Sequence, residues 1–490
     1  MPRERWPTRL TFLFAAVTSA IGLGAVWRFP YLTYKYGGGA FLLPYLIALV
    51  VAGIPLLILE FALGQKLQKG AVDAFASIRK RFSFIGWLAL FVGFIIIAYY
   101  AVVMGWSIIY FFASAGLQWG DDPKSYFFNN VLKISDGIGN VGKLVPALFI
   151  ALLVCWVMIY FSVWKGTKSV SKVVNFTTPF ALVLFLIMLV RAVTLEGSSE
   201  GIIFYLKPDF AALLDAEVWV AAFSQIFFQL SVGFGIMIAY ASFNDKKEDI
   251  ANNAVVVGVA TVIFTILAGF IIFGTLGFMA KAQNVPIDKV VASGPGLAYV
   301  VFPQALSLMP FAAFFSMLFF LILVTIAYDS AFSLVEAIDT VVTDKIKIRR
   351  ELIAFIVCLL GLLSGIIFTT NAGLYFLDVI DHFVNSYTLI AVGILECIAV
   401  GWVFGAEKLR VYVNKVSDIK IGKWWNFMIK YAVPVILAVT VIIQLTKEFA
   451  APYENYPQWA IWLGWISVIV PFIVAFLIPQ KAVKAGKVPE

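Results

Sequence analysis

The chain has 490 residues, of which 62% are hydrophobic and 13% are charged, and its mean hydropathy is +0.96. Soluble domains usually contain about 45–50% apolar and about 25% charged residues, so this composition excludes an ordinary soluble protein and predicts an integral membrane protein. The net charge of +8 does not indicate nucleic-acid binding, because the basic residues sit in short loops between apolar segments.

The residues that usually carry enzyme or metal chemistry are scarce. Cys155, Cys358 and Cys397 all lie within apolar runs, and His382 is the single histidine. This pattern indicates neither a disulfide framework nor a metal cluster. The sequence also lacks a phosphate-binding loop, a dinucleotide-binding glycine pattern and a nucleophile elbow. We therefore do not expect an enzyme.

The long apolar runs predict helices that cross a membrane. Runs such as residues 180–190 are unbroken, whereas β-barrel strands alternate apolar and polar residues. A spanning helix needs about 20 apolar residues, and by this criterion we expect twelve spans. The third and eighth look long enough to tilt. The spans are expected to begin near Leu10, Gly39, Ile85, Leu144, Val173, Val218, Ala251, Phe311, Leu352, Leu374, Phe427 and Trp459.

The loops predict the orientation of these spans. Four loops on one side, residues 65–82, 164–172, 344–351 and 406–423, are rich in Lys and Arg, and the opposite loops are poorer in both. Cytoplasmic loops carry the excess of basic residues in membrane proteins. We therefore expect a multi-pass protein of the cell membrane with both termini in the cytoplasm.

Two spans contain a matched pair of glycines. Gly22 and Gly24 lie in the first span, and Gly233 and Gly235 lie in the sixth. Each glycine costs about 1 kcal/mol relative to alanine in a helix. The simplest interpretation is that the glycines only permit close packing. The matched depth favours another, in which both helices are broken and bind a substrate at the membrane midplane.

This pattern predicts a 5+5 inverted repeat with broken first and sixth helices. The first half would comprise residues 1–193, the second half residues 194–403, and residues 404–490 would hold spans eleven and twelve and a tail. The N-termini of half-helices favour an anionic group, and the freed carbonyls favour a cation.

Three carboxylates fall inside the apolar spans: Glu60, Asp329 and Glu396. Such residues are functional candidates because a charge at the bilayer centre costs at least about 2.5–3.5 kcal/mol. Asp329 and Ser330 together offer hard oxygen ligands for a small cation such as sodium, unless neighbouring helices satisfy the carboxylate. Glu60 and Glu396 are interpreted as structural carboxylates, with Glu60 accepting hydrogen bonds from the unwound part of another span.

Several motifs carry a family resemblance: residues 3–15, 20–32, 36–45, 53–65 and 225–235. With these motifs and the expected twelve spans, the chain resembles the neurotransmitter:sodium symporters nearly end to end. This family includes the bacterial leucine transporter and the eukaryotic monoamine, GABA and glycine transporters.

The resemblance implies a substrate site and a second sodium site. Tyr100 matches the tyrosine that binds the substrate carboxylate, and Gly22 replaces the aspartate of monoamine transporters, which favours a neutral amino acid. The implied sodium ligands are Thr18, Ile21, Ile326, Asp329 and Ser330. The implied substrate residues are Ser19, Gly22, Leu23, Gly24, Ile96, Tyr100, Phe228, Ser231, Phe234, Ser330 and Leu334.

The resemblance also implies two gates. The outer gate would pair Arg28 with Asp381 beneath a lid of Tyr100 and Phe234. The inner gate would pair Arg3 with Asp344 near Trp6.

The first sodium site departs from the family pattern. Its usual side-chain ligands are replaced by Ala25, Gln229 and Thr261, although Ala20 would still supply a carbonyl. We therefore expect that only the second site binds sodium. Chloride stays open, because the glutamate of chloride-independent bacterial members is Thr265 here, beside Tyr45 and Gln225.

The sequence thus predicts a sodium-coupled symporter that imports a neutral, hydrophobic amino acid by alternating access. Its partners would be at least one Na⁺, a small-molecule substrate and the lipid bilayer, with no nucleic acid. Two alternatives keep the fold: an amine or another amino-acid-like substrate, or coupling to protons through Asp329 or Glu60. A third is a sensor that binds its ligand without moving it. The oligomeric state is left open.

Overall fold

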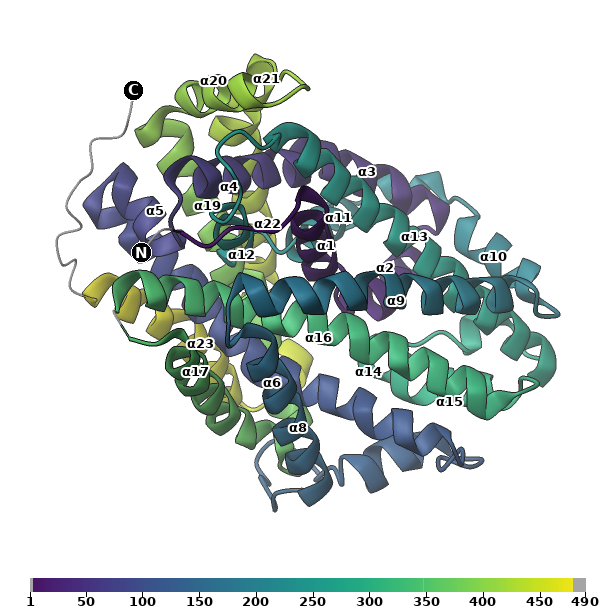
Figure 1. The fold of residues 1–490 in the computed structure, drawn as a ribbon. Coiled ribbons are helices and arrows are strands. Elements are labelled where there is room, and N and C mark those ends of the chain that lie inside the picture. The colour runs from purple at the N-terminus through teal and green to yellow at the C-terminus, as the bar shows by residue number, and fades with distance from the viewer. Residues whose placement is uncertain (1–2, 347, 479–490) are drawn as a thin grey trace.

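Figure 1 presents the computed structural model, which describes residues 3–346 and 348–478. These residues form helices joined by loops and contain no β-sheet, only two isolated bridges. The fold is therefore all-α over this part of the chain, as the apolar runs predicted. The end of the expected tail and one residue of the loop at 344–351 lie outside the described residues.

Within the described residues, ten helical runs are long and apolar enough to cross a membrane. The helices α1 (Arg9–Ala20) and α2 (Gly24–Lys35) together make an eleventh, bent by 51° at the break between them. The ten runs are Gly39–Leu67, Lys80–Ser114, Pro146–Val163, Thr167–Val193, Ile250–Gln283, Ala312–Lys345, Arg350–Thr369, Gly373–Val416, Lys423–Asn455 and Gln458–Leu477.

These runs confirm eleven of the twelve expected starting points to within about six residues. The expected sixth span is divided between α11 (Ala216–Gln229) and α12 (Ile236–Ala241), and neither is long enough to cross a membrane alone. The runs at 80–114 and 312–345 have 35 and 34 residues, well beyond the length that a straight crossing needs. The run at 250–283 is equally long at 34 residues, which was not predicted from the sequence.

The two broken helices lie at the centre of the bundle. In Figure 1, α1 and α12 are surrounded by α4 (Ile54–Leu67), α9 (Thr167–Val193) and α16 (Ala312–Lys345). The long helix α6 (Ser83–Ser114) packs along α16. The outer helices instead expose large apolar side chains, such as Phe176, Leu182 and Val190 of α9. Exposed surface of this kind is suited to lipid.

The second break is held in shape by hydrogen bonds from other helices. Ser231, Gly233 and Gly235 have φ angles of 54°, 81° and 74°, which lie in the left-handed region that glycine tolerates best. The Gly233 N–H donates to Glu60 Oε1 over 2.7 Å, and Glu60 is fully buried with Glu396 beside it. This geometry agrees with the structural role expected of Glu60.

The glycines of the first break serve a different purpose. Neither Gly22 nor Gly24 has a positive φ. A Cβ on Gly22 would lie 3.4 Å from Ser330 Oγ and 3.5 Å from Tyr100 Oη. These glycines therefore keep the space beside the break open, and they do not relieve backbone strain.

Replacing Glu60 tests its hydrogen bond to the broken helix. Glu60→Met leaves the buried Gly233 N–H without an acceptor, so we expect a loss of about 1–3 kcal/mol in stability. Glu60→Gln keeps an acceptor oxygen and should lose much less. Melting temperatures of the detergent-purified proteins measure both. Equal melting temperatures for the two variants would contradict this role.

A second test concerns the contact of α10 (Ser198–Leu206) with α13 (Ile250–Gln283). A Cβ on Gly201 would lie 1.9 Å from the backbone oxygen of Phe273, so the two helices must separate to admit it. We expect Gly201→Ala to cost about 1–3 kcal/mol through overpacking. Gly139→Ala is the matched control, because nothing lies within 4 Å of its Cβ position. Thermal unfolding of both variants measures the difference.

Candidate functional site

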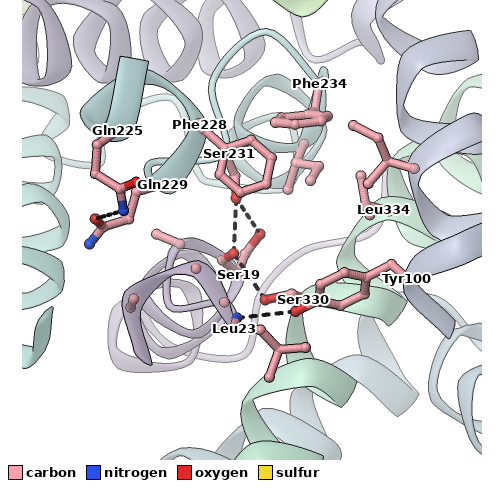
Figure 2. Close-up of a pocket in the computed structure, with 16 residues that line it drawn as sticks. Ser19, Leu23, Tyr100, Gln225, Phe228, Gln229, Ser231, Phe234, Ser330 and Leu334 are labelled. Atoms are coloured by element: carbon pink, nitrogen blue, oxygen red, sulfur yellow. Dashed lines mark hydrogen bonds between the residues drawn. The ribbon is translucent and has the colours of Figure 1, made fainter. Parts of the chain in front are cut away.

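A small cavity lies where the two broken helices face each other. Figure 2 shows its lining, which comes from the break between α1 and α2, from α6, from the break between α11 and α12, and from α16. All eleven residues expected to contact the substrate line this cavity. Five further lining residues are Ala20, Ala25, Gln225, Gln229 and Ile236.

One end of the cavity is polar because α2 begins there. The first backbone N–H groups of a helix lack partners inside it, and the helix dipole adds partial positive charge. The hydroxyl of Tyr100 accepts the Leu23 N–H over 3.3 Å, which leaves its own proton available to a ligand. This end can therefore bind a carboxylate or a similar anion.

Two serine hydroxyls tie the broken segments together beside this end. Ser231 Oγ donates to the Ser19 carbonyl over 2.9 Å, and so links the two breaks directly. Ser330 Oγ lies 3.4 Å from the carbonyls of Ser19 and Ile21.

The other end of the cavity is apolar. It is formed by Ile96, Phe228, Phe234 and Leu334, with the two phenylalanine rings edge to face at 6.3 Å. A ligand with one anionic end and one apolar end matches this arrangement.

Four of the five residues expected at the second sodium site line a neighbouring cavity of about 340 Å³. The fifth, Ser330, reaches them through its contact with the Ile21 carbonyl. Asp329 is buried and its Oδ1 has no hydrogen-bond partner, although the hydroxyls of Thr18 and Thr177 lie near its carboxylate. Within the described residues, no cluster of three His, Cys, Asp or Glu side chains forms a metal centre. One carboxylate with hydroxyls and carbonyls suits a monovalent cation better than a divalent one.

The residues at the position of the first sodium site bond to one another. Gln229 lies against Thr261 and Thr265 on one side and against Tyr45 and Gln225 on the other. Ala20 and Ala25 line the central cavity next to Gln229 and bring no side-chain oxygen.

The outer-gate residues lie near each other without a direct bond. Asp381 accepts hydrogen bonds from Tyr99 Oη at 2.6 Å and from Asn385 Nδ2 at 2.8 Å. The Arg28 guanidinium lies over the Phe228 ring, 5.7 Å from its centre. Among the ion pairs of residues 3–346 and 348–478, none joins Arg28 to Asp381.

The residues expected to form the inner gate are directly bonded. Arg3 Nη1 lies 2.5 Å from Asp344 Oδ1, and its Nη2 donates to Ser242 Oγ. Asp344 also accepts the Gly70 N–H at 2.8 Å, and Trp6 Nε1 donates to the carbonyl of Tyr240 at 2.8 Å. Burial lowers the pKa of Arg3, and the charge of Asp344 offsets part of that effect.

Some partners of the gates and of the cavity were not predicted from the sequence. Asn385 could have been found, because it is polar and lies four residues after Asp381, on the same helix face. Tyr99 and Ser242 carry no such signal, since only the packing of distant helices brings them to the gates. Ile236 lines the cavity because it follows the second break directly.

Comparisons with known proteins agree with this architecture. A family model described as the sodium:neurotransmitter symporter family matches residues 3–122 and 117–484. An uncharacterized sodium-dependent transporter of Methanocaldococcus jannaschii is 42% identical over 487 residues, which cover 99% of each chain.

Two relatives from Rattus norvegicus are also similar over most of their length. The sodium- and chloride-dependent GABA transporter 2 is 35% identical, over 96% of this chain and 85% of its own. The sodium- and chloride-dependent taurine transporter is 33% identical, over 97% and 84%. The chain therefore belongs to the sodium:neurotransmitter symporter family, and it is a multi-pass membrane transporter of a sodium-coupled kind, not an enzyme.

Proposed function

We propose that this protein imports a neutral amino acid together with sodium by alternating access, and that the substrate binds in the central cavity. The observation that carries this proposal is the pairing of the α2 N-terminus with the Tyr100 hydroxyl at one end of an otherwise apolar cavity. The substrate carboxylate would bind at the polar end, and its side chain would lie among Phe228, Phe234 and Leu334.

The size of the cavity favours a small substrate. Its volume is about 60 Å³. A cavity of this size favours a small substrate over a peptide.

Asp329 supports the site of sodium coupling. Its Oδ1 is buried without a partner, beside Thr18 on α1 and Ser330 on α16. A sodium ion there would neutralise the carboxylate and join the two helices. We assign one coupled sodium to this site and none to the first site, where Gln229 takes the available contacts.

The gates support an outward-facing conformation. The inner pair Arg3 and Asp344 is bonded, whereas the outer pair Arg28 and Asp381 is not. In this proposal the chain has twelve spans, with α11 and α12 as a broken sixth span. The halves at 1–193 and 194–403 move against each other, residues 404–490 flank them, and both termini face the cytoplasm.

A second candidate substrate class is an ω-amino acid or aminosulfonate. The names of two relatives give GABA and taurine as their substrates, and each of these has an acidic group with a distant amine. Gln225 Oε1 is buried without a partner at the edge of the cavity and could accept a hydrogen bond from such an amine.

Substrate binding and counterflow in proteoliposomes test the proposed function. We expect saturable, sodium-dependent binding of a radiolabelled neutral amino acid that GABA, taurine and simple amines displace weakly. The same measurements are repeated with sodium replaced by choline and at two pH values. Tighter binding of GABA or taurine would show that the substrate is an ω-amino acid or aminosulfonate. Uptake that acid stimulates in the absence of sodium would indicate that protons are the coupling ion. Binding without counterflow would indicate a sensor.

The sodium assignment predicts the effect of one substitution. Asp329→Ala should remove the difference in substrate binding between sodium and choline, because the only charged ligand of the site is lost. Native behaviour in size-exclusion chromatography checks the fold. Asp378→Asn is the control, since its carboxylate is bound by Tyr453 and Tyr456 away from the cavities. Sodium-dependent binding by Asp329→Ala would reject the site.

The carboxylate assignment predicts the effect of another substitution. Tyr100→Phe removes a hydrogen bond to a charged ligand, worth about 1.5–3 kcal/mol, and should weaken substrate binding roughly 10- to 100-fold. Tyr160→Phe, in α8 (Pro146–Val163), is the control because Tyr160 lines neither cavity. Radioligand saturation curves give both affinities, and an unchanged affinity for Tyr100→Phe would place the carboxylate elsewhere.

A further inference from the structure

A buried polar cluster lies on one side of the central cavity. It consists of Tyr45 on α3 (Leu42–Ala48), Gln225 and Gln229 on α11, and Thr261 and Thr265 on α13. All five residues are at most 5% exposed, and none of them is charged. In Figure 2, Gln225 and Gln229 lie together, away from Tyr100 and Ser330.

The carboxamide oxygen of Gln229 receives the donors of this cluster. Tyr45 Oη donates to it over 2.8 Å, and Gln225 Nε2 donates to it over 3.2 Å. Two buried donors that converge on one point would otherwise need an anion or a water there, because an unpaired buried donor is costly.

The carboxamide nitrogen of Gln229 meets acceptors on the opposite side. It donates to Thr265 Oγ1 and lies 3.5 Å from the Thr261 carbonyl. Thr265 Oγ1 itself donates to that carbonyl over 2.8 Å, so its oxygen can only accept from Gln229. In this arrangement the Gln229 oxygen faces the donors Tyr45 and Gln225, and its nitrogen faces the acceptors on α13.

We propose that the carboxamide of Gln229 is a built-in neutral replacement for an ion pair, so that this transporter does not bind chloride. Its oxygen takes the donors that would hold an anion, and its nitrogen takes the acceptors that would hold a cation. The space is filled by a dipole that is already satisfied at both ends. A chloride ion would have to displace Gln229 and would leave its amide unpaired in a buried site.

The same geometry indicates how a chloride site could be opened. Gln229→Ser removes the carboxamide and leaves the hydroxyl of Tyr45, the amide of Gln225 and the hydroxyl of Thr265 around the vacated space. The Tyr45 hydroxyl and the Gln225 amide are then free to donate, and the hydroxyl of the introduced serine adds a third neutral donor of the kind that holds a buried anion. We therefore expect the variant to gain chloride binding that the unmodified protein lacks.

Binding of radioactive chloride to the purified full-length protein tests the proposal. We expect no saturable binding by the unmodified protein. Gln229→Ser should bind chloride saturably, and bromide but not gluconate should compete. Two controls are built on this variant: adding Tyr45→Phe should weaken the binding by removing a donor, and adding Thr265→Glu should abolish it by supplying a fixed negative charge.

Thermal unfolding gives a second readout that needs no substrate. Exchange of sodium gluconate for sodium chloride should leave the melting temperature of the unmodified protein unchanged and should raise that of Gln229→Ser. Gln229→Thr serves the same purpose if the serine variant does not fold. Saturable chloride binding by the unmodified protein would overturn the proposal, as would a folded variant that binds none.

Only the consequence of this proposal for transport rests on the proposed function; the absence of chloride binding does not. Both readouts remain valid if the amino-acid assignment fails, because neither contains an organic substrate. Conversely, chloride binding by the unmodified protein would leave the substrate cavity and the Asp329 site unaffected.

Discussion

The structure depends on satisfying the backbone where two helices are unwound inside a membrane. Each unpaired N–H or C=O in this setting costs several kcal/mol, so a break persists only where other groups bind it. Glu60 binds the second break at Gly233, and Ser231 binds the carbonyl of Ser19. Ser19 and Ser231 also line the central cavity, whereas Glu60 supports the second break from outside it. The link between the two breaks is therefore made at the cavity itself.

Charge is sparse around the two cavities. Among the described residues that line them, Asp329 is the one carboxylate. The neighbouring polar cluster at Gln229 is neutral and internally bonded. A single buried carboxylate accommodates one monovalent cation, and a neutral cluster needs no counter-ion. The proposed ion use therefore follows from which polar groups already have hydrogen-bond partners.

The sequence predicted most of the fold because membrane helices leave a strong signal. Runs of about 20 apolar residues located eleven spans, and the glycine pairs located both breaks. The sequence did not show why each glycine is needed. Gly233 is needed for its positive φ and Gly22 for the space beside it, and a sequence does not separate these two requirements. The short half-helix α12 also falls below any length criterion.

The lining of the cavity was predictable only through resemblance to a family. Serines at 19, 231 and 330 are ordinary residues in a membrane helix, and no spacing brings them together. The contacts of Gln229 were unpredictable in another way. A glutamine can present either its oxygen or its nitrogen, and the sequence does not show that the oxygen meets Tyr45 and the nitrogen meets Thr265. Such choices are made by tertiary packing.

The position of Asp329 relates ion binding to conformational change. Asp329 belongs to the long helix α16, which packs along α6, whereas Thr18 belongs to the half-helix α1. A cation held by both would be bound more tightly when α1 lies against α16 than when α1 moves away. A ligand shifts a conformational equilibrium only by its difference in affinity for the two states, and moving a population from 1:99 to 99:1 takes about 5.5 kcal/mol. Most of that energy must come from the bonds between the cation and its oxygen ligands on α1, which break when α1 moves. Arg3 lies just before α1 and its partner Asp344 lies at the end of α16, so the same movement would break this pair. The proposed sodium site and the proposed inner gate would therefore favour the same conformation from the two ends of one half-helix.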